Sequence, residues 1–247
     1  MISVIGCGYW GKNLIRTFGE LGMLFSVHDT NQAVQQQFTK EYNLESISFE
    51  EMLKSESVKG VVIATTAETH FKLAKQALKN NKHVFIEKPI CLELSDAKTL
   101  GELSEMHSRI LMVGHLLQYH DHFKKLKEII LSDKLGKIKK VKSTRKSYGI
   151  LREHEDVIWS FAPHDISMIL SLFKDEKINN FCTHKKMIFN SNTDSAHLFF
   201  QIEGANIEIE VDWTSYEKLQ RIEVYCEKGI IVFEDSTLDP DKKVLLN

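Results

Sequence analysis

Two short segments of this chain carry side chains that could move a proton to or from a hydroxyl group. Glu87–Pro89 directly follows an expected strand, and Pro163–Asp165 opens an expected helix. A lysine such as Lys88 can polarise a hydroxyl or shuttle its proton, and His164 has an unperturbed pKa of about 6.5, which suits proton transfer at neutral pH. On residue type alone, a surface lysine and a structural histidine remain alternatives, so the fold has to decide.

A glycine-rich segment between the first expected strand and the first expected helix could bind a dinucleotide. Gly6-Cys7-Gly8-Tyr9-Trp10-Gly11 has the spacing GxGxxG. Its glycines permit a tight turn, close approach of the backbone to a pyrophosphate, and close helix packing. The N-terminus of the next helix offers N–H groups to phosphate. A glycine turn that binds nothing is the alternative, and the flanking strand and helix disfavour it.

An acid follows the second expected strand, where dinucleotide-binding domains place one. Asp29 can accept hydrogen bonds from the adenine-ribose hydroxyls and would repel a 2′-phosphate. This favours NAD over NADP, although the neighbouring His28 weakens the exclusion of NADP.

The elements that must position these groups alternate regularly in the first half of the chain. Strand patterns cover residues 2–6, 23–28, 58–64, 83–86 and 110–113, and helix patterns cover 12–21, 31–42, 69–80 and 95–107. Such an α/β alternation predicts a Rossmann domain, a doubly wound parallel sheet with helices on both faces. Ligands of such sheets lie at the carboxyl ends of the strands, where Lys88 is expected.

The second half is dominated by strands. They are expected at 139–146, 181–189, 196–203, 205–213, 219–226 and 230–233, with helices at 121–132 and 163–173. We therefore expect an NAD-binding Rossmann domain over 1–118 and an α+β domain with a largely antiparallel open sheet over 119–247.

Composition excludes several classes of function. The net charge of −2 gives no support for nucleic-acid binding, and the densest basic run, Lys134–Lys146, fits a solvated surface better than an anion site. The four cysteines form no CxxC pair, so no metal site is expected. Met1 leads directly into a strand and no apolar run could span a membrane, which predicts a cytoplasmic protein without a membrane partner.

Several segments, taken together and in order, resemble the Gfo/Idh/MocA oxidoreductase family over essentially the whole chain. They are Gly6–Gly11, Ala64–His70, Glu87–Pro89, Gly114–His115 and Pro163–Asp165. Within that family the chain resembles the UDP-N-acetylglucosamine and UDP-N-acetylglucosaminuronate 3-dehydrogenases. The segments that carry this closer resemblance are Gly8–Asn13, Gly114–His120 and Trp159–Ser167.

The resemblance assigns roles to single residues. It implies that Lys88 contacts the nicotinamide ribose and the substrate hydroxyl, and that His164 is the second acid/base group. Glu87 would help to hold the nicotinamide ribose. The implied cofactor residues are Gly6, Cys7, Gly8, Tyr9, Trp10, Gly11, Asp29, Thr65, Thr66, His70, Glu87 and Lys88; the family often has proline where Thr66 stands.

We expect the substrate pocket between the domains. Aromatic rings can stack on uracil or sugar, and arginine can pair with a pyrophosphate or a uronate carboxylate. Core packing explains Tyr119 and Trp159 equally well, and a surface ion-pair cluster explains Arg152 at least as well. The expected substrate residues are Tyr119, Arg145, Tyr148, Trp159, His164 and Asp165, with Tyr9, Trp10 and Arg152 as further lining candidates.

The resemblance implies NAD-dependent oxidation of the C3 hydroxyl of a UDP-N-acetyl amino sugar, neutral or uronic, for surface polysaccharide biosynthesis. A dehydrogenase of a free sugar or inositol, and a non-catalytic NAD-binding regulator, are the alternatives. Related enzymes continue through a further helical segment, so the expectation is a shortened second domain. A broad antiparallel sheet needs cover on its exposed face, which predicts a homo-oligomer, a dimer or a tetramer.

Overall fold

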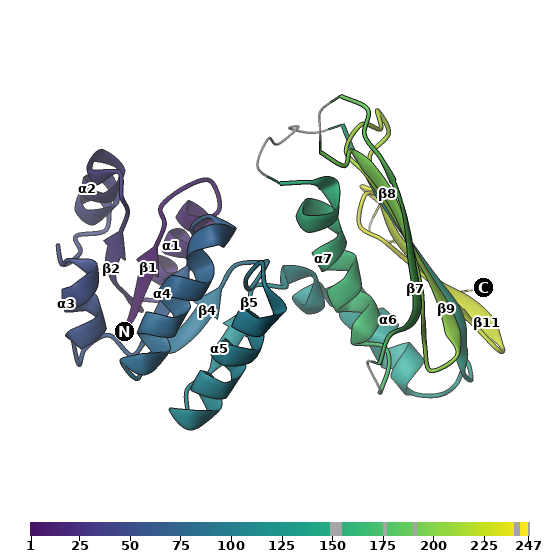
Figure 1. Ribbon diagram of the computed structural model, residues 1–247, viewed down its shortest axis with the longest axis horizontal. Helices are drawn as coiled ribbons and strands as arrows, with labels where there is room; N and C mark the ends of the chain where they lie inside the picture. The colour runs from purple at the N-terminus through teal and green to yellow at the C-terminus, as the bar shows by residue number, and fades with distance from the viewer. Residues whose placement is uncertain (149–154, 175–176, 190–191, 240–242, 247) are drawn as a thin grey trace. The chain divides into compact units, whose positions relative to one another are not determined.

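The chain forms two compact units, Met1–Gly114 and His115–Asn247, in a computed structural model (Figure 1). The structure describes residues 1–148, 155–174, 177–189, 192–239 and 243–246. The division falls just before η1 (Leu116–Tyr119), whereas the sequence placed it after Gln118. The short helix goes with the second unit because it packs against helices α6 and α7 there.

The first unit is built on a parallel sheet of five strands, all within residues 1–114, which are described without a gap. The strands are β1 (Ile2–Ile5), β2 (Leu24–His28), β3 (Gly60–Ile63), β4 (His83–Ile86) and β5 (Leu111–Val113). Their order is β2-β1-β3-β4-β5, so the winding reverses between β1 and β3. The expected doubly wound parallel sheet is confirmed, and its switch point lies beside the glycine-rich segment.

Helices cover both faces of this sheet. Alternate residues of β1 separate the faces: Val4 packs with helices α1 (Gly11–Glu20) and α2 (Gln32–Glu41), and Ile5 packs with the other three. Those three are α3 (Phe49–Lys54), α4 (Ala67–Lys79) and α5 (Leu94–Met106). Because both faces are covered, every residue of β3 is buried.

The second unit contains a seven-stranded sheet within its described residues. The strands are β6 (Ile138–Lys146), β7 (Asn179–Lys186), β8 (Ser195–Ile202), β9 (Ala205–Asp212), β10 (Leu219–Cys226), β11 (Gly229–Glu234) and β12 (Val244–Leu246). The order is β12-β11-β10-β6-β9-β8-β7, and the central pair β6–β9 is parallel while the other neighbours are antiparallel. The expected α+β unit with a largely antiparallel sheet is confirmed.

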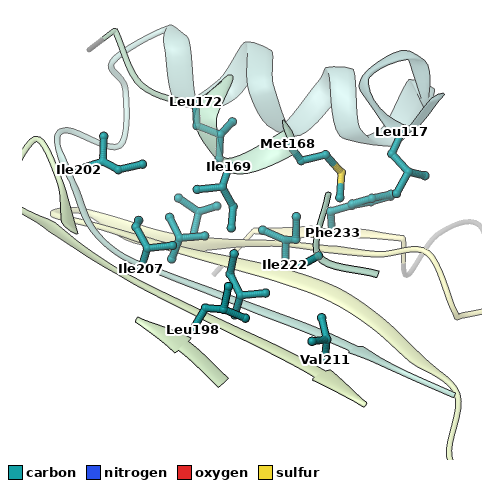
Figure 2. Close-up of a cluster of buried hydrophobic side chains, with 14 of the residues drawn as sticks. Leu117, Met168, Ile169, Leu172, Leu198, Ile202, Ile207, Val211, Ile222 and Phe233 are labelled. Carbon is teal, nitrogen blue, oxygen red and sulfur yellow. The ribbon is translucent and has the colours of Figure 1, made fainter. Parts of the chain in front are cut away.

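Two helices bury one face of this second sheet, α6 (Asp121–Leu131) and α7 (Val157–Leu170). Figure 2 shows Met168, Ile169 and Leu172 pointing from the helical layer toward the strands. On the sheet side, the strands contribute Leu198, Ile207, Val211 and Ile222. This single apolar layer fixes how α7 lies on the sheet.

Helix α7 starts earlier than the sequence indicated. Pro163 was expected to open the helix, but the helix begins at Val157 and contains Pro163. Asp156 provides the cap, because its carboxylate accepts a 3.0 Å hydrogen bond from the Trp159 backbone N–H. His164 therefore lies in the middle of α7 and does not start a helix, which corrects the sequence interpretation.

Candidate functional site

The candidate cofactor residues gather at the carboxyl edge of the first sheet. The glycine-rich segment follows β1, Asp29 follows β2, Thr65 follows β3, and Glu87 and Lys88 follow β4. Carboxyl ends of parallel strands share one edge, so four separate sequence segments reach the switch point together. This is the place where doubly wound sheets bind nucleotides.

Two of the three glycines in the glycine-rich segment are required by its own backbone conformation and packing. Gly6 has a φ of +92°, and a Cβ atom there would lie 2.6 Å from the Ala64 carbonyl oxygen. A Cβ atom on Gly11 would overlap the carbonyl oxygen of Gly6. At Gly8, by contrast, a Cβ atom would meet no protein atom within 4 Å. The segment therefore folds tightly at its ends and leaves open space in the middle.

The start of α1 adds a favourable electrostatic term at the same place. The helix has no side-chain cap at Trp10 and no acidic residue in its first turn. No carboxylate of the helix's own first turn offsets its N-terminal partial positive charge. Open space beside Gly8 and this helix end fit the pyrophosphate of a dinucleotide.

Asp29 is tied to the glycine-rich segment by its own carboxylate. Its Oδ2 atom accepts a 2.7 Å hydrogen bond from the Cys7 backbone N–H, and its Oδ1 atom accepts one of 2.8 Å from the Asn31 N–H. A carboxylate has about four acceptor positions, so it retains capacity for ribose hydroxyls. The residues present therefore fit the adenine ribose of NAD.

The thiol of Cys7 is held in its neutral form. Burial, and secondarily the Asp29 carboxylate, raise the pKa of Cys7 to about 12. The residue contributes its backbone N–H to the site, and its side chain is not a nucleophile.

Glu87 is enclosed by protein groups. Trp10 donates a 2.7 Å hydrogen bond from Nε1 to Glu87 Oε1, and the Lys88 backbone N–H donates one of 3.4 Å to Oε2. A Cβ atom on Gly114 would lie 2.8 Å from Oε1. Burial raises the pKa of this carboxyl, and the hydrogen bond from Trp10 opposes the rise.

His70 lies beneath the loops. Only 1% of it is exposed, and its two ring nitrogens face the Pro89 carbonyl oxygen at 2.7 Å and the Thr65 carbonyl oxygen at 3.2 Å. Burial lowers the pKa of the imidazole. From the sequence, His70 was expected to line a cofactor cleft. In the structure, its ring instead lies between the segments that follow β3 and β4 and contacts a carbonyl oxygen of each.

The remaining candidates of the first unit are accessible. Lys88 is half-buried, Tyr9 is 82% exposed with its ring 5.2 Å from Lys12 Nζ, and Thr66 is exposed just before α4. Thr65 shares a 2.6 Å hydroxyl hydrogen bond with Thr69. These side chains can meet a ligand without disturbing the core.

In the second unit, two of the expected substrate residues pair with each other. Arg145 on β6 donates to both carboxylate oxygens of Asp165 on α7, at 2.7 and 3.2 Å, and both side chains are buried. Ser143, which no sequence pattern singled out, donates a 2.7 Å hydrogen bond to the same carboxylate. This network fastens α7 to the sheet one residue from His164.

Other expected substrate residues remain open to solvent. His164 is half-buried on α7, while Trp159, Tyr119 and Tyr148 are exposed. Arg152 lies outside the described residues. Gln118 also holds this region, because its side-chain amide donates a 2.5 Å hydrogen bond to the Ser167 carbonyl oxygen and joins η1 to α7.

The described residues offer no candidate for two other kinds of site. No group of three or more histidine, cysteine, aspartate or glutamate side chains there could hold a metal ion. None of the described helices has both the length and the apolar character needed to cross a bilayer.

Comparison with known families matches both units. Residues 1–115 match the family described as "Oxidoreductase family, NAD-binding Rossmann fold", and residues 123–232 match the "GFO/IDH/MocA C-terminal domain". Both matches agree with the sites that the geometry indicates, a dinucleotide site in the first unit and a separate second domain.

Several individual proteins are similar to this chain, each at a low sequence identity. The myo-inositol 2-dehydrogenase of Thermotoga maritima is 23% identical over 93% of this chain and 74% of its own length. The UDP-N-acetylglucosamine 3-dehydrogenase of Acidithiobacillus ferrooxidans is 25% identical over 72% of this chain and 55% of its own length. A solved structure of the latter enzyme superposes with a TM-score of 0.87 at 21% identity, covering 94% of this chain and 76% of the other. The structural likeness shows a shared fold.

Proposed function

The chain belongs to the Gfo/Idh/MocA oxidoreductase family, and on that premise we propose that it is a dehydrogenase of a UDP-N-acetyl amino sugar. The group it oxidises is the CH–OH at C3 of the sugar, which is either neutral or uronic. NAD is the cofactor, and when bound it would supply the hydride acceptor for C3. The product is the 3-keto sugar, which suits surface polysaccharide biosynthesis.

Lys88 holds the substrate hydroxyl and takes up its proton as the C3 hydride leaves. The lysine follows β4 at the same sheet edge as the glycine-rich segment, which is the position this role requires. Asp29 binds the adenine ribose, and the open space beside Gly8 receives the pyrophosphate. Glu87 and His70 act on the Lys88 segment as supports, because both are buried with protein partners.

His164 is the second acid/base group of the proposal. Its place on α7 is fixed by the buried Arg145–Asp165 pair, so we assign these two residues to positioning instead of direct substrate contact. Trp159, Tyr119 and Tyr148 present exposed rings that can stack on uracil or sugar.

The choice of a nucleotide sugar rests on the resemblance of the segments Gly8–Asn13, Gly114–His120 and Trp159–Ser167 to the UDP-N-acetylglucosamine 3-dehydrogenases. The 25% identity to one such enzyme over 72% of this chain supports it. A second candidate is dehydrogenation of an inositol. The match to myo-inositol 2-dehydrogenase, which covers 93% of this chain, favours it.

The experiment that separates the candidates is a single-turnover assay with NAD and four substrates: UDP-N-acetylglucosamine, its uronic acid, myo-inositol and free glucose. Counting NADH formed per protein registers turnover even if NADH stays bound. Borodeuteride reduction of the product then locates the keto carbon by mass spectrometry. Deuterium at C3 of a UDP-sugar supports the proposal, and turnover of myo-inositol alone contradicts it. NAD binding without turnover of any substrate would favour the regulator.

We further propose that the protein works in the cytoplasm as a homodimer or homotetramer. The oligomeric part of this proposal is supported by the sheet of the second unit. Helices α6 and α7 cover one face of that sheet, and a second subunit would cover the other. Sedimentation velocity tests this part, and a monomer at micromolar concentration would contradict it.

A further inference from the structure

A hydrogen bond between Trp10 and Glu87 joins the segments that follow β1 and β4, two strands that are not adjacent in the sheet. Trp10 belongs to the glycine-rich segment after β1, Glu87 follows β4, and β3 lies between these strands. The 2.7 Å hydrogen bond between Trp10 Nε1 and Glu87 Oε1 therefore passes over the carboxyl end of β3. This hydrogen bond directly links the glycine-rich segment to the segment that carries Lys88.

The Glu87 carboxyl depends on this donor. The residue is 9% exposed, so little water reaches it, and Gly114 is close enough that a Cβ atom there would lie 2.8 Å from Oε1. Its other oxygen has a longer hydrogen bond, 3.4 Å, from the Lys88 backbone N–H. A buried carboxylate that loses its strongest donor has to move or take up a proton.

The two ends of the Lys88 segment are held differently. On one side, His70 bonds the Pro89 carbonyl oxygen and is itself buried. On the other side, Trp10 is 39% exposed as a residue, and it lies in the glycine-rich segment, which a bound dinucleotide would contact. Trp10 is thus the one of these two supports that a bound cofactor can reach.

We propose that Trp10 is a positioning residue that transmits the arrangement of the cofactor-binding loop through Glu87 to Lys88. It rests on the proposed function in one respect, the role of Lys88 in proton transfer. Trp10 itself contacts no reacting atom. Its indole N–H orients the Glu87 carboxylate, and that carboxylate fixes the Lys88 backbone.

The first test needs no catalysis. Amide hydrogen exchange, followed by mass spectrometry, is compared in the unliganded wild-type protein and in Trp10→Phe, which keeps a ring and removes the N–H donor. Peptides that cover Glu87 and Lys88 should exchange about tenfold faster in the variant, the size expected for losing one hydrogen bond to a charged group. Glu87→Gln weakens the same bond from the other side and should show a smaller effect in the same peptides.

Trp213→Phe is the matched control. Trp213 also donates an indole hydrogen bond of 2.7 Å to a buried carboxylate, that of Asp194, but in the second unit. It should change exchange around Asp194 and leave the Glu87–Lys88 peptides unchanged. Equal exchange of those peptides in Trp10→Phe and wild type would overturn the proposal.

The second test uses the active enzyme with whichever substrate it turns over. Trp10→Phe should lower kcat about tenfold, because the indole acts on Lys88 through the Glu87 carboxylate. A variant with faster exchange but unchanged kcat would also overturn the proposal. A wild type that oxidises no sugar would defeat the proposed function, while the exchange comparison would still decide whether the indole holds the Lys88 segment.

Discussion

Arg145 on β6 donates hydrogen bonds of 2.7 and 3.2 Å to the Asp165 carboxylate on α7, and both side chains lie inside the second unit. The Arg145 guanidinium and the Asp165 carboxylate neutralise each other, and Ser143 donates a further hydrogen bond to the carboxylate. A buried pair of this kind fixes geometry more than it adds stability. What it fixes here is α7, the helix that carries His164.

Breaking this pair should destabilise the second unit. Arg145→Met leaves the Asp165 charge buried without its arginine, and we expect a loss of about 3–5 kcal/mol in the free energy of unfolding. Urea denaturation measures it. The double variant Arg145→Met/Asp165→Leu should recover most of the loss, because no unpaired charge remains. A stable Arg145→Met protein with only a raised KM would show instead that Arg145 binds substrate.

Removing the acid after β2 should weaken NAD binding and reduce discrimination against NADP. For Asp29→Ala we expect the Kd for NAD to rise roughly 10- to 100-fold, because hydrogen bonds to the ribose hydroxyls and to the Cys7 N–H are lost together. The Kd for NADP should rise less, since the repulsion of its 2′-phosphate also disappears. Isothermal titration with both cofactors checks this. Asn31→Ala, which removes a helix cap but keeps Asp29, should leave the NAD/NADP ratio unchanged.

The raised pKa of Glu87 predicts a pH dependence of stability. Since burial raises the folded-state pKa above the usual 4.5, the folded protein binds this proton more tightly than the unfolded chain does. Its favourable contribution is complete below that usual value and is lost as pH rises through the folded-state pKa. Glu87→Gln should therefore gain thermal stability relative to wild type as the pH goes from 4 to 7. A constant difference in Tm across that range would contradict the assignment.

Cysteine reactivity should follow burial. With a pKa of about 12, fewer than about one Cys7 thiol in a thousand is ionised at pH 8, so Cys7 should resist alkylation. Cys182 is exposed on β7 and should be labelled first. Timed iodoacetamide labelling with peptide mass spectrometry tests the order, and Cys182→Ser should abolish the fast phase. Rapid labelling of native Cys7 would show that the glycine-rich segment opens.

The sheets were predictable because they depend on local patterns. The alternation of β-branched strands and amphipathic helices predicted the doubly wound parallel sheet, but not the order of its strands. Strict alternation, as in Ala205–Asp212, gave the strands of the second sheet. Helix α3 was missed although it carries a sequence signal. Ser48 and Glu51 form a capping box, a pattern that predicts a helix start even for a short element.

The start of α7 was misplaced because proline is favoured in the first turn of a helix. Asp156, an ordinary cap residue, marks the true start, and packing against the sheet offsets the hydrogen bond that Pro163 cannot donate. The partners of Asp165 and Glu87 could not be predicted. Arg145 and Trp10 are far from them in sequence, and only the folded sheets bring these side chains together.

The role of Lys88 is tested by the rate of hydride transfer in Lys88→Ala, measured in a single turnover with saturating NAD and the UDP-sugar that the wild type oxidises. We expect a rate roughly 10²- to 10⁴-fold below wild type, the range for a lost general acid or base, with the Kd for NAD changed only slightly. A Lys88→Ala protein that reduces NAD at the wild-type rate would contradict the assignment of Lys88 to proton transfer.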